Sequence, residues 1–167
     1  ADRCTIRVAD HNYDPGWDYD VDEKVPKRYR KFVTQLIEKW KTELLPKVGL
    51  FTNIKVGFVS SLGDGVIGSY IDGTSSEPYF VLDIKEIEKA TEEFGQEVWL
   101  GIETTLLHEM GHAIQDAKGL PYDEDEAEQF SYDYYNRGQI SVPGAKLKDK
   151  GAGLSKRFHI KRSLSKE

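Results

Sequence analysis

The sequence predicts an α+β protein in which a small, mostly antiparallel sheet of about four strands packs on three helices. The helices are a long N-terminal one, one around residue 108, and one that follows it. The first has apolar residues at helical spacing, and the other two have recognisable start and stop signals. Between the first and the second helix, short β-rich segments alternate with turns. At 167 residues, a single domain is expected.

Composition limits the class of protein. The only cysteine, Cys4, excludes an internal disulfide framework and a cysteine-rich zinc site. No apolar run approaches the length of about 20 residues that a membrane span needs. We therefore expect a soluble monomer without a membrane partner, and we favour the cytoplasm as its compartment.

Charge divides the chain into two parts. Residues 146–167 hold eight Lys or Arg against Asp149 and Glu167, whereas the whole chain has a net charge of −6. The rest of the chain is therefore strongly acidic. We expect a domain over 1–145 and a basic arm over 146–167 that makes weak contact with polyanions.

The first half of the chain predicts one helix and several strands. A β-rich segment over 4–9 precedes a long amphipathic helix that starts at Pro26 and ends near Pro46 and Gly49. Segments 53–60, 66–71 and 79–84 read as strands joined by short turns, which favours antiparallel neighbours. The segment 66–71 contains Gly68 and Ser69, and it would suit an exposed edge that pairs with an extended peptide.

The second half predicts three helices. The first covers 85–94, and the second covers 97–118 with Gly119 as its stop. The third runs from 124 to 137, with Asp123 and Glu126 as a capping box and Gly138 as its stop.

The segment that carries chemistry lies in the second of these helices. It contains H-E-x-x-H, with His108, Glu109 and His112. Residues four apart share one helix face, so both imidazoles can reach a single Zn²⁺ ion. Glu109 lies about 100° round the helix, where a general base for a metal-bound water belongs.

A catalytic zinc site needs a third protein ligand. Gln115 and Lys118 stand where the extended H-E-x-x-H-x-x-G-x-x-H pattern would have Gly and His, which argues against a third histidine. The candidates are the acids around the start of the following helix: Asp123, Glu124, Asp125, Glu126 and Glu128.

The segment 124–131 resembles the E-x-E-A-[DN]-x-F-A stretch of gluzincin metallopeptidases of the ImmA/IrrE type and the HtpX/CAAX-protease type. The resemblance covers roughly residues 97–135. It implies a zincin-like fold, with Glu124 as a zinc ligand and Ala127 as the small residue that lets the helices pack closely. Glu128 would accept a hydrogen bond from a ligating histidine. The short turn before Glu124 could nevertheless place it too far from His112, so Glu128 stays open as the alternative ligand.

The resemblance also implies a zinc metalloendopeptidase that acts on a protein or peptide substrate, with Glu109 as the general base. Tyr132, Tyr135 and His159 are candidates for the donor that stabilises the oxyanion. Two other classes of function remain open. One is a nucleic-acid-associated protein that uses the basic residues 156–162, and the other is a non-catalytic, zinc-stabilised binding module.

Overall fold

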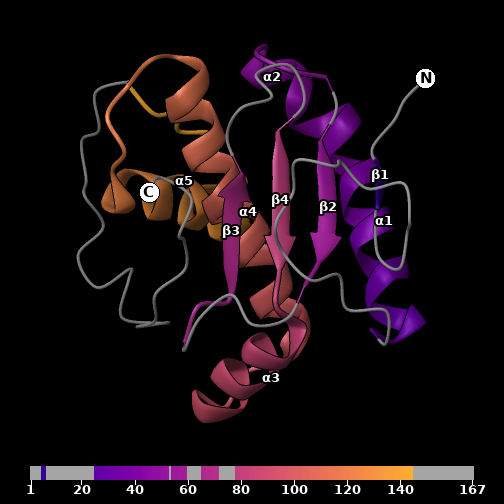
Figure 1. The fold of residues 1–167 in the computed structure, drawn as a ribbon. Coiled ribbons are helices and arrows are strands. Elements are labelled where there is room, and N and C mark those ends of the chain that lie inside the picture. Colours follow the sequence, from indigo (N-terminus) through magenta and orange to yellow (C-terminus); the bar gives the residue numbers. More distant parts are fainter. Residues whose placement is uncertain (1–4, 7–24, 53, 60–64, 72–77, 145–167) are drawn as a thin grey trace.

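The computed structural model describes residues 5–6, 25–52, 54–59, 65–71 and 78–144 (Figure 1). Within these ranges the chain forms a small mixed sheet and five helices, which confirms the α+β class. The strands are β1 (Thr5–Ile6), β2 (Lys55–Phe58), β3 (Gly68–Ile71) and β4 (Tyr79–Leu82). The helices are α1 (Lys27–Glu43), α2 (Leu45–Val48), α3 (Ile84–Glu93), α4 (Val98–Ala117) and α5 (Glu124–Arg137).

The sheet is not mostly antiparallel, so that prediction is wrong. Its order is β1-β2-β4-β3, and only β3 and β4 run antiparallel to each other. The β1–β2 and β2–β4 pairs are parallel. Because α1 connects β1 to β2, those two strands form a β-α-β unit, which produces a parallel pair. The short turns had suggested sequential pairing, but β4 lies between β2 and β3.

The apolar content of the strands explains this order. All four residues of β4 are buried, as in a central strand covered on both faces. By contrast, β3 contains Gly68 and Ser69 and takes the edge position. The edge position predicted for this segment is therefore confirmed. The side chains of Ser69 and Tyr70 in this strand are nevertheless buried.

Helices α1 and α4 lie behind the sheet in the view of Figure 1 and contact each other. On α1, the apolar residues at helical spacing are buried, with Trp40 fully enclosed. Helix α4 is apolar over most of its surface, and 14 of its 20 residues are buried. Such a helix belongs in the interior, which explains how its polar residues come to be buried as well.

Two close contacts fix the position of α4. A Cβ atom on Gly68 would lie 2.6 Å from Cγ2 of Thr105, so glycine allows the edge strand β3 to approach α4. The hydroxyl of Tyr70 donates a hydrogen bond of 2.7 Å to Oδ2 of Asp116, near the end of α4. Strand β3 is thereby held against the helix that contains H-E-x-x-H.

Several predictions concern segments outside the described residues. They include the remainder of the first strand beyond Thr5–Ile6 and the basic arm over 146–167 with its polyanion contact. These stay predictions. Of the helices in the described part of the chain, none has both the length and the apolar composition required to cross a membrane.

Candidate metal centre

Helix α4 holds His108 and His112 next to each other. Their exposed fractions are 3% and 2%, so both rings are shielded from bulk water. The ring centroids lie 4.9 Å apart, with an angle of 77° between the ring planes. This arrangement follows from the i,i+4 spacing, which places both side chains on one face of the helix.

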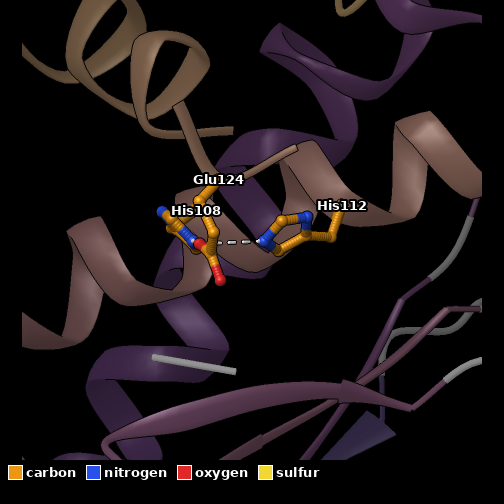
Figure 2. Close-up of side chains that lie close together, drawn as sticks. All are labelled: His108, His112 and Glu124. Atoms are coloured by element: carbon orange, nitrogen blue, oxygen red, sulfur yellow. Dashed lines mark hydrogen bonds and ion pairs between the residues drawn. The ribbon is translucent and has the colours of Figure 1, made fainter. Parts of the chain in front are cut away.

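Helix α5 brings a carboxylate to the two rings (Figure 2). Oε1 of Glu124 lies 2.7 Å from Nε2 of His108 and 3.3 Å from Nε2 of His112. Within the described residues, these three side chains form the only group of at least three His, Cys, Asp or Glu whose ligand atoms converge. All three ligand atoms lie within 4.8 Å of one another. The cluster could therefore bind a metal ion.

The donor geometry fits a small divalent metal. Zinc forms bonds of about 2.0–2.1 Å to imidazole nitrogen and carboxylate oxygen, so neighbouring ligands of a tetrahedral site lie about 3.3 Å apart. Two of the three separations, 2.7 and 3.3 Å, need little adjustment to reach that value, and the third is no more than 4.8 Å. Three protein ligands would leave one position of a tetrahedral ion open.

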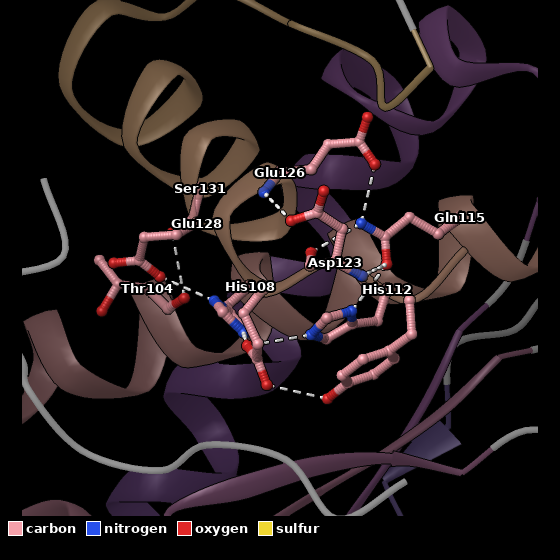
Figure 3. Close-up of polar contacts among 10 residues, drawn as sticks. Thr104, His108, His112, Gln115, Asp123, Glu126, Glu128 and Ser131 are labelled. Atoms are coloured by element: carbon pink, nitrogen blue, oxygen red, sulfur yellow. Dashed lines mark hydrogen bonds and ion pairs between the residues drawn. The ribbon is translucent and has the colours of Figure 1, made fainter. Parts of the chain in front are cut away.

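Hydrogen bonds at the outer nitrogens decide which ring atom faces the cluster (Figure 3). Nδ1 of His108 donates to Oε1 of Glu128 over 2.7 Å. Nδ1 of His112 donates to Oε1 of Gln115 over 2.8 Å. With Nδ1 carrying a proton in both rings, Nε2 is the atom left to bind either a second proton or a metal ion. A metal ion would replace any proton on the Nε2 atoms of the two histidines.

Gln115 holds His112 and the start of α5 together. It is 1% exposed, and its Nε2 donates to the carbonyl oxygen of Asp123 (2.8 Å) and to Oε1 of Glu126 (2.9 Å). Because the amide NH₂ has two acceptors, the amide oxygen must be the group that accepts from His112. Sequence reasoning missed this role, although the i,i+3 spacing of His112 and Gln115 on one helix was a usable signal.

The predicted capping box forms only in part. The side chain of Asp123 accepts from the backbone N–H of Glu126 (3.1 Å), as expected of an N-cap. The carboxylate of Glu126, however, accepts from Gln115 and from the backbone N–H of Gly144. The backbone N–H of Asp123 donates to Gln115 instead. Gln115 thus takes the place of the reciprocal bond in the box.

Glu124 connects the buried rings to solvent. Its side chain is 51% exposed, whereas the side chains of His108 and His112 are 4% and 0% exposed. Partial burial raises the pKa of the Glu124 carboxyl, but the hydrogen bonds with the two histidines outweigh burial. They hold this pKa well below its usual range, so the carboxyl is ionised at neutral pH.

The structure gives the two competing acids different positions. Glu124 lies in the cluster, whereas Glu128 lies at the far nitrogen of His108, the arrangement that the gluzincin resemblance implied. Glu124 does not lie too far from His112, because its Oε1 atom is 3.3 Å from Nε2 of His112.

Glu109 is fully buried within α4, with an exposed fraction of 0%. Glu109 directly follows His108, and a carboxyl group loses its hydration when it is buried. Buried ionisable groups at a cluster of this kind are candidates for chemistry.

Two of the predicted oxyanion donors, Tyr132 and Tyr135, lie in the described part of the chain, and their role stays a prediction. Tyr132 lies beneath the guanidinium of Arg137, 5.2 Å from ring centroid to Cζ. Tyr135 is 38% exposed and lines a cavity together with Lys39 and Gly138. His159 lies outside the described residues. The tyrosine that does contact the cluster is Tyr122, in the turn before α5, which sequence reasoning overlooked.

Close packing of α4 on α5 determines where Glu124 lies relative to the two histidines. A Cβ atom on Gly111 would lie 2.8 Å from Cα and 3.0 Å from Cβ of Ala127, so glycine is needed at this contact. The small residue at 127 was expected for this reason, and Ala127 is fully buried. Its partner Gly111 is the residue just before His112 in H-E-M-G-H.

We expect Gly111→Ala to separate α4 from α5 and weaken metal binding about tenfold. The obstructing atoms belong to backbone and Cβ, so α5 must move, and overpacking of this kind costs about 1–3 kcal/mol. Alanine gains up to about 1 kcal/mol in helix propensity. Urea unfolding in the presence of a chelator measures stability, and competition with a coloured chelator measures zinc affinity. An alanine variant that is more stable and binds zinc as tightly as wild type would contradict the close-packing argument.

Comparisons of the chain with protein-family models, with curated proteins and with solved structures found no match. Membership of the gluzincins therefore stays an expectation from the resemblance. What the structure establishes is narrower: His108, His112 and Glu124 form a cluster that could bind a metal ion.

Proposed function

We propose that the chain is a zinc-dependent peptidase with a zincin-like fold, in which His108, His112 and Glu124 bind the metal and Glu109 is the general base. The observation that carries the proposal is the convergence of two imidazole nitrogens and one carboxylate oxygen, with the buried Glu109 on the same helix as both histidines. Two neutral nitrogens and one oxygen match the ligand set of catalytic zinc.

Each residue has a distinct task. A zinc ion bound here would act as a Lewis acid toward a carbonyl group and would lower the pKa of water. Glu109 would accept a proton from the attacking water and pass it to the leaving amine. Glu128 and Gln115 would keep the two histidines oriented through their Nδ1 atoms. The half-exposed Glu124 would lie on the side from which a substrate enters.

Strand β3 is the part of the sheet best suited to bind the substrate backbone. It occupies one edge of the described sheet and packs against α4 through Gly68 and Tyr70. Backbone N–H and C=O groups on an edge strand can pair with an extended peptide. This supports a peptide as the substrate class, and the preferred side chains are left open.

Metal removal tests the proposal directly. Purified protein that has not met a chelator should contain about one zinc per chain by elemental analysis. Prolonged dialysis against a chelator should abolish cleavage of a peptide library, and stoichiometric zinc should restore it. The same two-histidine, one-carboxylate set can also hold iron(II) in oxygenases. Iron in place of zinc, or cleavage that is insensitive to the chelator, would overturn the proposal.

The main rival is a binding module in which zinc only stabilises the helix pair. Glu109 argues against it, because a structural zinc site does not need a general base. A chain that binds one zinc and becomes markedly more stable, yet cleaves no member of a broad peptide library, would favour this rival.

A further inference from the structure

Tyr122 contacts two of the three residues in the cluster. Its hydroxyl donates a hydrogen bond of 3.0 Å to Oε2 of Glu124, the carboxylate oxygen that does not face the histidines. Its ring stacks on the imidazole of His112, with centroids 4.0 Å apart and an interplanar angle of 5°. One side chain in the α4–α5 turn therefore restrains a ligand from each helix.

The hydrogen bond to Oε2 has a consequence for how Glu124 can bind a metal. A carboxylate can use one oxygen or both, and an oxygen that already accepts from a phenol is less available to the ion. With Oε2 held by Tyr122, Oε1 remains directed at Nε2 of both histidines. Coordination through one oxygen would leave another position of a bound ion free.

The stacking contact has a separate consequence for His112. Gln115 holds the Nδ1 atom of this imidazole, and Tyr122 covers its face. A ring that is fixed at one edge and along one face loses little rotational freedom when it binds a metal, which favours affinity.

The geometry points to Tyr122 as a positioning residue of the metal centre, which holds Glu124 in one-oxygen coordination through its hydroxyl and holds His112 through its ring. This inference rests on the metal site of the proposed function but not on peptide cleavage. The alternative is that Tyr122 has only a packing role in the turn. In that case its hydroxyl would not be needed for metal binding.

Two variants separate the two contacts. Tyr122→Phe removes the hydroxyl and keeps the stacking ring, so the zinc dissociation constant should rise about tenfold. Tyr122→Leu also removes the stacked ring, and the dissociation constant should rise about a hundredfold. Tyr134→Phe is the matched control, because it removes the same group from a half-buried tyrosine that lines the cavity with Lys39 and Glu103. The zinc affinity of Tyr134→Phe should equal that of wild type.

Cobalt(II) provides a readout that a general packing role would not change. Cobalt absorbs more weakly in the visible region as its coordination number rises. We therefore expect the cobalt-loaded Tyr122→Phe protein to absorb less than wild type or Tyr134→Phe, because Glu124 gains the freedom to bind through both oxygens. Circular dichroism of the zinc-free proteins checks that all variants are folded.

The outcomes are distinguishable. If Tyr122→Phe matches wild type in zinc affinity and in the cobalt spectrum, the role of the hydroxyl is wrong. If Tyr122→Leu also binds zinc as tightly as wild type, the whole positioning role is wrong, while the metal site still stands. If wild type binds no zinc at the cluster, both the inference and the proposed function fall. Weaker zinc binding with an altered cobalt spectrum supports the role of the hydroxyl, whether or not a peptide is cleaved. Weaker binding with an unaltered spectrum rejects control of the coordination mode.

Discussion

His112→Ala should contain no zinc and should cleave no peptide. Removing this side chain leaves one imidazole and one carboxylate, which is too few ligands for a stable catalytic zinc site. Elemental analysis after purification without chelators measures the metal, and cleavage of a fluorogenic peptide library measures activity. Asp125→Ala is a suitable control, because it removes an exposed acid next to Glu124 in the first turn of α5.

Loss of His112 also removes one of the two hydrogen bonds to Oε1 of the buried Gln115, which still accepts from the backbone N–H of Asp123. Losing a typical hydrogen bond costs about 0.5–1.5 kcal/mol, so the zinc-free variant should be somewhat less stable than zinc-free wild type. Circular dichroism and urea unfolding establish that the variant is folded before its metal content is interpreted. If a folded His112→Ala protein retained one equivalent of zinc, the metal site would have to lie elsewhere in the chain.

Glu109→Gln should keep its zinc and its fold but lose peptide cleavage by about 10²–10⁴-fold. The amide has nearly the same shape as the carboxyl but cannot accept a proton at neutral pH, so the loss should appear in kcat. Because the side chain is completely buried and the amide fills the same space, the variant should still fold. Metal content, unfolding in urea and steady-state kinetics are measured on the same preparation.

Glu103→Gln is the matched control for this variant. Glu103 lies on the same helix, and burial raises the pKa of its carboxyl, which the nearby Lys39 opposes. It lines the cavity between α1 and α5 rather than the metal cluster. Its replacement should therefore leave cleavage unchanged. Turnover by Glu109→Gln within a few-fold of wild type would show that the general base is a different group, even with zinc present.

The helices could be predicted because their signals are local. Asp123 begins α5 and Gly138 ends it in a left-handed conformation, as expected, since caps depend on the backbone of a few neighbouring residues. The order of the strands could not be predicted in the same way. It depends on which strand is the most completely buried, and β4 takes the centre at the expense of sequential pairing.

The sequence by itself determined the pairing of His108 with His112, because the 3.6-residue period of a helix places residues four apart on one face. It also limited the remaining ligand to a few acids near the start of α5. Only the tertiary structure decided that Glu124 faces the rings while Glu128 binds the outer nitrogen of His108. That choice depends on the position of α5 along α4. The close contact between Gly111 and Ala127 fixes this position. The positions of Gln115 and Tyr122 have the same origin, because they depend on where the two helices meet in space.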